Sequence, residues 1–331
     1  IIIALITYCM APIVATQPSW FYVMVVVTVL LLTELKHTFT EFAQRMKNDE
    51  MITLAKFLAI SGIILPMLPH KNLIPDINLT PYSIWLATVV VSGISYLSYL
   101  LKRYVFHESG TLVSGIIGGL YSSTATISVL ARKSRKASEQ EATDYVAAML
   151  LAVSMMFLRF MILILIFSRE IFLSIYPYLL TMAVVAAIVA WFIHSRQKRP
   201  EDQPAETEED DSSNPLEFKV ALIFAVLFVI FTFLTHYTLV YAGTGGLNLL
   251  SFVSGFSDIT PFILNLLQNT GSVAALIITA CSMQAIISNI MVNMFYALFF
   301  AGKGSKLRPW ILGGFGVVIV CNLVLLLFFY I

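Results

Sequence analysis

Long apolar runs, separated by short polar stretches, dominate the chain. Runs long enough to cross a hydrocarbon layer of about 30 Å are typical of membrane-spanning helices. They lie at 20–35, 53–69, 83–101, 142–168, 172–194, 218–242, 272–300 and 309–331, with a partial run at 1–14. Two further candidates, 111–131 and 247–267, are interrupted by glycine and by hydroxyl-bearing residues. The pattern predicts an all-α polytopic integral membrane protein.

Composition agrees with this class of protein. Hydrophobic residues make up 59% of the chain and charged residues only 12%, which excludes an ordinary soluble domain. The acidic stretch EDQPAETEEDDSSNP (201–215) lacks large apolar residues, so it predicts a disordered linker between two membrane halves. The histidines lie at or near membrane boundaries, and no Ser or Cys has an obvious base partner. We therefore expect neither an enzyme nor a cofactor.

The two glycine-interrupted segments form the core of a weak internal repeat. Placing Gly119 over Gly255 aligns GGLYSSTATISVLA with SGFSDITPFILNLL at a spacing of 136 residues, and Ser122 then matches Asp258. Each copy is preceded by one long apolar run and followed by two more. Internal repeats of this kind are common in transporters and often have opposite orientations in the membrane.

The distribution of basic residues favours one topology. If every segment spans the membrane, Lys and Arg divide almost evenly, with ten on one side and nine on the other. If 111–131 and 247–267 instead enter and leave on the same side, 17 of the 20 basic residues face the cytoplasm. Because basic residues concentrate in cytoplasmic loops, the sequence predicts two re-entrant hairpins and two inverted repeats. Each repeat then has three spanning helices plus one hairpin.

A simpler interpretation of the first segment remains open. Gly115 and Gly119 form a small-xxx-small pattern, and Ser and Thr often hydrogen-bond between membrane helices. On this interpretation the segment spans the membrane and packs tightly against a neighbour.

Polar residues inside the apolar segments are the candidates for function. Asp258 is the one acidic residue well inside an apolar segment, and Arg159 is the one basic residue. Such residues are costly in a membrane and usually mark a functional site, although a buried ion pair that only locks two halves together is the alternative. The candidate pathway comprises Gly118, Gly119, Ser122, Ser123, Thr124, Thr126, Arg159, Gly255, Asp258, Thr260, Asn265, Asn289 and Asn293, with Asp258 as a candidate metal ligand.

Three quoted segments carry a family resemblance: LAKFLAISGIILPMLP (54–69), GIIGGLYSSTATISVLARKSRK (115–136) and SGFSDITPFILNLL (254–267). Together they resemble the MgtC/SapB-type bacterial membrane proteins and, more narrowly, their C-terminal domain-of-unknown-function 4010 family. The resemblance implies a bacterial inner-membrane location and an association with magnesium homeostasis. Family members usually have two acids in the second hairpin, whereas this chain has Asp258 followed by Thr260.

The expected organisation follows from the runs and the resemblance. It comprises the tail of a truncated N-terminal MgtC-like domain with a cytoplasmic amphipathic helix (1–50), a connecting helix and loop (53–81), repeat 1 (82–195), the cytoplasmic linker (196–216) and repeat 2 (217–331).

The leading functional expectation is a channel or secondary transporter for a small inorganic ion, with its site where the hairpins meet. A cation is the first choice because a single carboxylate lies among hydroxyls and amides. Arg159 leaves an anion or a proton-coupled solute as alternative substrates. The alternative is a non-transporting regulatory or scaffold protein of the MgtC type. We expect membrane lipid and a small inorganic ion as partners and no nucleic acid. A homodimer is one option, because many small inverted-repeat proteins pair.

Overall fold

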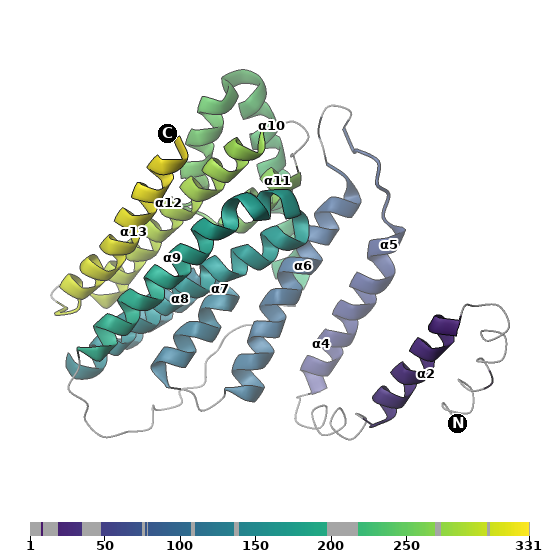
Figure 1. Ribbon diagram of the computed structural model, residues 1–331, viewed down its shortest axis with the longest axis horizontal. Helices are drawn as coiled ribbons and strands as arrows, with labels where there is room; N and C mark the ends of the chain where they lie inside the picture. Colours follow the sequence, from purple (N-terminus) through teal and green to yellow (C-terminus); the bar gives the residue numbers. More distant parts are fainter. Residues whose placement is uncertain are drawn as a thin grey trace. The chain divides into compact units, whose positions relative to one another are not determined.

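The described part of the chain is almost entirely helical (Figure 1). The computed structural model describes residues 8, 19–34, 48–74, 77, 79–106, 110–135, 139–196, 218–268, 273–302 and 305–330. Seven helices among these residues are long and apolar enough to cross a membrane. The chain divides into two compact units, Ile1–Lys56 and Phe57–Ile331, which are described separately.

The first unit contains one complete described helix, α2 (Ser19–Glu34), and the start of α4 (Asn48–Ala59). The apolar run predicted at 20–35 is helical, but α2 has 16 residues. At 1.5 Å per residue it is about 24 Å long, somewhat less than the thickness of a bilayer core. The partial run at 1–14, apart from Tyr8, and most of the predicted amphipathic helix lie outside the described residues.

The second unit begins within an interrupted helical segment. α4 passes into the π-helical turn η1 (Ile60–Ile64) and then into α5 (Leu65–Met67), so the run predicted at 53–69 is helical but irregular. The next helix, α6 (Pro81–Leu100), starts at a capping box. There Thr80 Oγ1 accepts from the Ser83 amide, and Ser83 Oγ accepts from the Thr80 amide. η2 (Leu101–Val105) extends α6.

Helices α8 (Glu139–Phe167) and α9 (Arg169–Ser195) form an antiparallel pair, as the runs at 142–168 and 172–194 predict (Figure 1). A hydrogen bond joins the two helices near mid-length, where the hydroxyl group of Ser154 donates to the Ala183 carbonyl at 2.8 Å. The sharp turn between them is capped by Ser168, whose Oγ accepts from the Ile171 amide. This hairpin supports the residues of the cavity described below.

α7 (Thr111–Lys133) is broken near its middle. Ser122 has non-helical backbone angles (φ −159°, ψ 107°), so the segment consists of two shorter helices. A Cβ placed on Gly118 would lie 2.5 Å from Thr126 Oγ1, although the two residues are eight positions apart. In a straight helix that separation would be about 12 Å. The second half of α7 therefore bends back toward the first.

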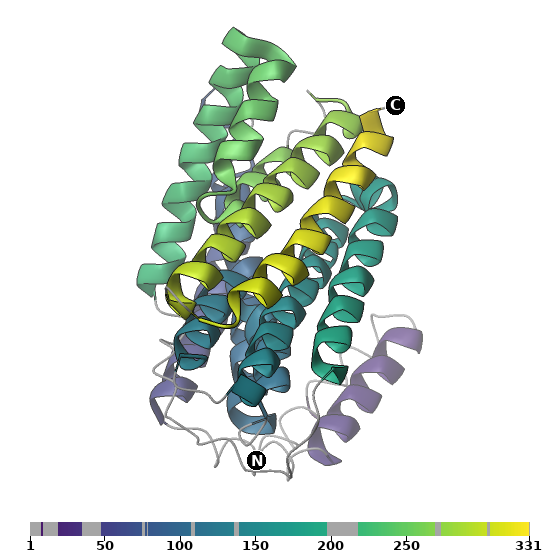
Figure 2. The same cartoon turned by 90° about the vertical axis from the view of Figure 1, so that its left-hand side faces the viewer.

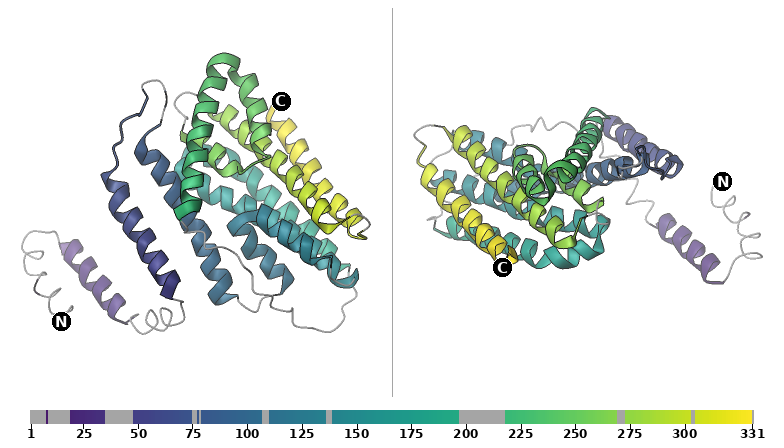
Figure 3. Two further views of the ribbon diagram at one scale, coloured as in Figure 1. Left: turned by 180° about the vertical axis from the view of Figure 1, so that it is seen from behind. Right: turned by 90° about the horizontal axis from the view of Figure 1, so that it is seen from above.

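α10 (Phe218–Ser254) is also broken, at Gly243. Its positive φ of 59° is a conformation that glycine adopts without steric strain. Beyond this residue the helix folds back, because a Cβ on Gly246 would lie 2.8 Å from Thr238 Cγ2 (Figure 3). The returning part ends at Ser254, and α11 (Ile259–Gln268) follows after a short non-helical segment. The segment predicted at 247–267 thus consists of two short helices with a break at 255–258.

α12 (Ala275–Ala301) and α13 (Arg308–Tyr330) lie side by side and complete the unit (Figure 2). α12 is the most enclosed of the seven long helices, with 67% of its most apolar window buried against at most 50% in the others. It contacts α7, α9, α10, α11 and α13. Polar residues on α12 therefore face protein on several sides, while the exposed apolar side chains of the other helices form the outer surface.

Candidate functional site

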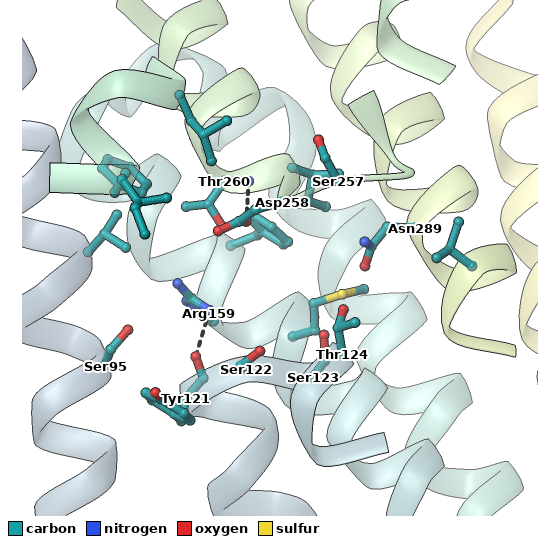
Figure 4. A pocket seen from close by; sticks show the side chains of 18 of the residues that line it. Ser95, Tyr121, Ser122, Ser123, Thr124, Arg159, Ser257, Asp258, Thr260 and Asn289 are labelled. Atoms are coloured by element: carbon teal, nitrogen blue, oxygen red, sulfur yellow. Dashed lines mark hydrogen bonds between the residues drawn. The ribbon is translucent and has the colours of Figure 1, made fainter. Parts of the chain in front are cut away.

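A cavity of about 390 Å³ with a mixed polar and apolar lining lies in the second unit, where the breaks in α7 and before α11 face each other (Figure 4). α6, α7, α8, α10, α11 and α12 all contribute to its wall. Among the described lining residues, Arg159 and Asp258 are the two that carry a formal charge. The remaining polar lining consists mainly of hydroxyl groups: Ser92, Ser95, Tyr121, Ser122, Ser123, Thr124, Ser257, Thr260 and Tyr296.

The α7 side of the cavity is organised around Ser122. Its Oγ accepts from the Ala125 amide at 3.3 Å, so it acts as an N-cap for the half-helix that continues to Lys133. Ser123 and Thr124, the first residues of this half-helix, also line the cavity. The positive end of the half-helix dipole is thus directed at the cavity.

The opposite side is organised in the same way around Asp258. Its Oδ1 accepts from the Thr260 amide at 2.9 Å and caps α11, which begins at the next residue. Asp258 itself is exposed and lines the cavity. Ser122 and Asp258, which occupy equivalent positions in the two copies of the internal repeat, therefore have the same local role.

Arg159 projects from α8 between these two breaks (Figure 4). Its Nη1 donates to the Tyr121 carbonyl at 2.9 Å, and this carbonyl immediately precedes the break at Ser122. Nε is buried and has no acceptor among the described residues. The Asp258 carboxylate attracts the guanidinium electrostatically. The described residues nevertheless contain no direct ion pair between the two, so the alternative of a locking salt bridge is not what the structure places here.

Asn289 on α12 has a role at the second break that parallels that of Arg159 at the first. Its Nδ2 donates to the Gly255 carbonyl at 3.2 Å, and its Oδ1 accepts from Asn293 Nδ2 at 3.2 Å. In each case a polar side chain of a long helix holds a carbonyl freed by a broken helix. Such bonds satisfy backbone groups that would otherwise be unpaired away from water.

Seven of the thirteen predicted site residues line the cavity: Ser122, Ser123, Thr124, Arg159, Asp258, Thr260 and Asn289. The other six are not among the lining residues: Gly118, Gly119, Thr126, Gly255, Asn265 and Asn293. Asn265, for example, is buried and donates to Thr232 Oγ1 at 2.6 Å, which joins α11 to α10. The described residues contain no group of three or more His, Cys, Asp and Glu side chains that could hold a metal ion. Asp258 would therefore be an isolated carboxylate ligand.

The glycines serve close packing. A Cβ on Gly119 would lie 2.5 Å from Ala152 Cα, and a Cβ on Gly115 would lie 2.3 Å from the Ala148 carbonyl oxygen. The first half of α7 therefore packs backbone to backbone against α8, as the small-xxx-small interpretation predicts. Tight packing and a broken helix occur in the same element, so the close packing alone does not separate the spanning interpretation from the re-entrant one.

Sequence reasoning missed the contributions of α6 and of the C-terminal part of α12. Ser92 and Ser95 are buried and line the cavity, as does Tyr296. The spacing of the two serines on one face of an apolar helix was a usable signal. Nothing in the sequence distinguishes the apolar lining residues of α10, such as Phe224, from ordinary core residues.

Seven long apolar helices and a polar cavity among them define a multi-pass helical membrane protein. Residues 89–301 match the family described as "Domain of unknown function (DUF4010)", and because the match covers more than half of the chain, the protein belongs to this family. It is 24% identical over 227 residues to an "Uncharacterized protein" of Aquifex aeolicus (strain VF5), covering 67% of this chain and 96% of that protein. No solved structure matches the chain. The narrower part of the expected resemblance is thereby confirmed, and the wider MgtC/SapB relationship stays a prediction.

Proposed function

We propose that the protein is a channel or secondary transporter for a small ion, and that the transported ion passes through the cavity between Ser122 and Asp258. One observation carries the proposal: a charged, hydroxyl-lined cavity lies where two helix breaks meet among apolar helices. Placing an Arg or Asp at the centre of a membrane costs at least about 2.5–3.5 kcal/mol on insertion scales. Irregular backbone at that depth occurs where it is buried in protein or lines a watery cavity. A translocation site accounts for both features.

The proposal includes two re-entrant hairpins and two inverted repeats. The bend that brings Gly118 to Thr126 supports the first hairpin. A second contact supports it independently, because Arg135 Nη2 donates to the Phe299 carbonyl at 3.2 Å and Arg135 Nε donates to the Phe300 carbonyl. If every segment spanned the membrane, Arg135 and the end of α12 would lie on opposite sides, about 30 Å apart. The re-entrant topology places both on the cytoplasmic side.

The cellular setting is part of the same proposal. The basic-residue distribution supports a cytoplasmic linker at 196–216, whose structure lies outside the described residues apart from Arg196. A bacterial inner-membrane location, a homodimer and a link to magnesium homeostasis rest on the sequence resemblance. Membrane lipid and a small inorganic ion are the proposed partners, and transport rather than catalysis is the proposed activity.

Flux measurements test this function. The purified full chain is reconstituted into liposomes, and uptake of a panel of inorganic cations and anions is followed under an imposed gradient and under voltage. We expect selective flux that changes in the Arg159→Gln and Asp258→Asn variants. The exposed residue Arg308 provides a matched control, because Arg308→Gln removes one basic charge at a position outside the cavity. A folded protein without flux of any ion would contradict the proposal.

A regulatory or scaffold protein is the second candidate, and one set of contacts favours it. The bonds from Arg159 to Tyr121 and from Asn289 to Gly255 hold helices together, which is all that a scaffold requires. The two candidates differ in whether water reaches the cavity. Only a transporter needs the side chains of Ser123 and Ser257 to be in contact with water during its cycle.

A further inference from the structure

The guanidinium of Arg159 has an unused donor edge. Its Nη1 donates to Tyr121, whereas neither Nε nor Nη2 has a protein acceptor among the described residues. Arginine stays protonated in proteins, so the guanidinium carries permanent positive charge. Nε is enclosed by protein, so a molecule in the cavity can approach only the Nη2 end. A buried charge without a paired carboxylate is strongly unfavourable, so water or an anion in the cavity is needed to compensate it.

The carboxylate of Asp258 does not take that role. Its Oδ1 is engaged by the Thr260 amide at the start of α11, and the α11 dipole lies next to its charge. The negative charge in the cavity is therefore partly compensated by its own helix. The helix ends at the two breaks do not decide the sign of the ligand, because at each break one helical segment ends and another begins. The guanidinium of Arg159, which has no carboxylate partner among the described residues, therefore favours a negative ligand over a bare cation.

We propose that the cavity binds an oxyanion, a carboxylate or a tetrahedral phosphate or sulfate, at the Nη2 end of Arg159. A charge-assisted hydrogen bond from Nη2 can hold one oxygen of such a group, and the hydroxyls of Ser95, Ser123 and Thr124 also line the cavity and can accept or donate further bonds. This inference rests on the proposed transport function and names the class of its substrate. It departs from the cation that the sequence alone favours.

The size of the cavity fits this class. A volume of about 390 Å³ is several times the share of one water molecule in the liquid, about 30 Å³. It falls within the range of about 300–1,000 Å³ that is typical of small-molecule sites. A small oxyanion or a small organic acid can therefore enter together with water.

Binding measurements on the full chain separate an anion site from a cation site. Equilibrium dialysis of the detergent-solubilised protein would use sulfate, inorganic phosphate, acetate, K⁺ and Mg²⁺ as probes. We expect saturable binding of at least one of the three oxyanions, weakened about 10- to 100-fold in Arg159→Gln. Arg159→Lys keeps the charge but not the planar guanidinium, so it should restore only part of the affinity. The three oxyanion arms distinguish carboxylate from tetrahedral anions.

The Asp258→Asn variant should affect the binding of oxyanions and the binding of cations differently. Asparagine is also a good N-cap, so α11 keeps its start while the cavity loses its negative charge. Oxyanion binding should then stay equal or become tighter, whereas binding of a cation would be abolished. The Arg308→Gln control should behave like the unaltered chain, and thermal unfolding would show that each variant is folded.

The outcomes also separate this inference from the proposed function. Cation binding and flux that depend on Asp258, without oxyanion binding, would overturn the anion site and leave transport in place. Oxyanion binding without flux would retain the anion site and contradict transport. Absence of both would overturn both.

Discussion

Two single residues, Ser122 and Asp258, show how much one side chain contributes at a helix break. Each accepts a hydrogen bond from an amide of the first turn that follows it. A broken helix leaves several N–H groups without intrahelical partners, and a capping side chain satisfies one of them. Because both residues also line the cavity, the structural role and the proposed functional role are combined in the same side chains.

At Asp258 the two roles can be separated by substitution. Asp258→Ala removes the cap and should lower the free energy of unfolding by about 1 kcal/mol, whereas Asp258→Asn should retain most of it. Equilibrium unfolding of the detergent-solubilised protein would measure both values. Equal destabilisation by Ala and Asn would show that the charge, rather than the cap, stabilises α11.

Among the elements, α7 depends most on the absence of side-chain atoms. Gly115 and Gly119 place its first half against the backbone of α8, and Gly118 lets its second half approach. The long helices α8 and α12 supply Arg159 and Asn289, whose side chains donate hydrogen bonds to backbone carbonyls at the two breaks. The geometry of the cavity therefore depends on the packing of α7 as much as on the polar residues.

A larger residue at Gly119 should disturb this packing. Its Cβ would meet backbone atoms of Ala152, which cannot move aside as a flexible side chain can. Gly119→Val should destabilise the protein by about 1–3 kcal/mol through overpacking and should reduce flux. Gly313 on α13 is the matched control, because a Cβ there meets nothing within 4 Å. Similar thermal stability of Gly119→Val and Gly313→Val would contradict the packing described for α7.

On the scale of the whole molecule, contacts between distant segments indicate how the second unit is arranged. Arg135, just after α7, donates to carbonyls at the end of α12, and Arg132 stacks on the Phe300 ring with 4.3 Å between its Cζ and the ring centroid. Tyr178 on α9 donates to Asn322 on α13. These contacts link the first and second halves of the sequence at several points.

The re-entrant topology makes a specific prediction for accessibility. In a cysteine-free background, single cysteines at Gly110 and Arg135, before and after α7, should react with an impermeant thiol reagent from the same side of a vesicle. A cysteine at Lys306 should react from that side too, because the end of α12 lies next to Arg135. Labelling of positions 110 and 135 from opposite sides would show that α7 spans the membrane.

The helices and several site residues were predictable from the sequence, because membrane burial imposes long apolar runs and makes charged exceptions such as Arg159 conspicuous. The glycine and hydroxyl cluster indicated an interruption within 111–131, and the structure has its break at Ser122. The fold-back at Gly243 lies between the predicted runs 218–242 and 247–267, so the sequence also indicated where this reversal occurs. The sequence could not separate Asn289, which lines the cavity, from Asn265, which bonds a neighbouring helix. Only the packing of distant helices decides that difference.

Water access to the cavity tests the central claim most directly. Ser123→Cys and Ser257→Cys each place one thiol in the cavity wall, one beside each break. Ser154→Cys is the control, because Ser154 is buried between α8 and α9 outside the cavity. In proteoliposomes, a water-soluble thiol reagent should modify both cavity cysteines much faster than the control, and the transported ion should slow the reaction. If both cavity cysteines react as slowly as the control, the cavity is not part of an aqueous pathway and the transport account is wrong.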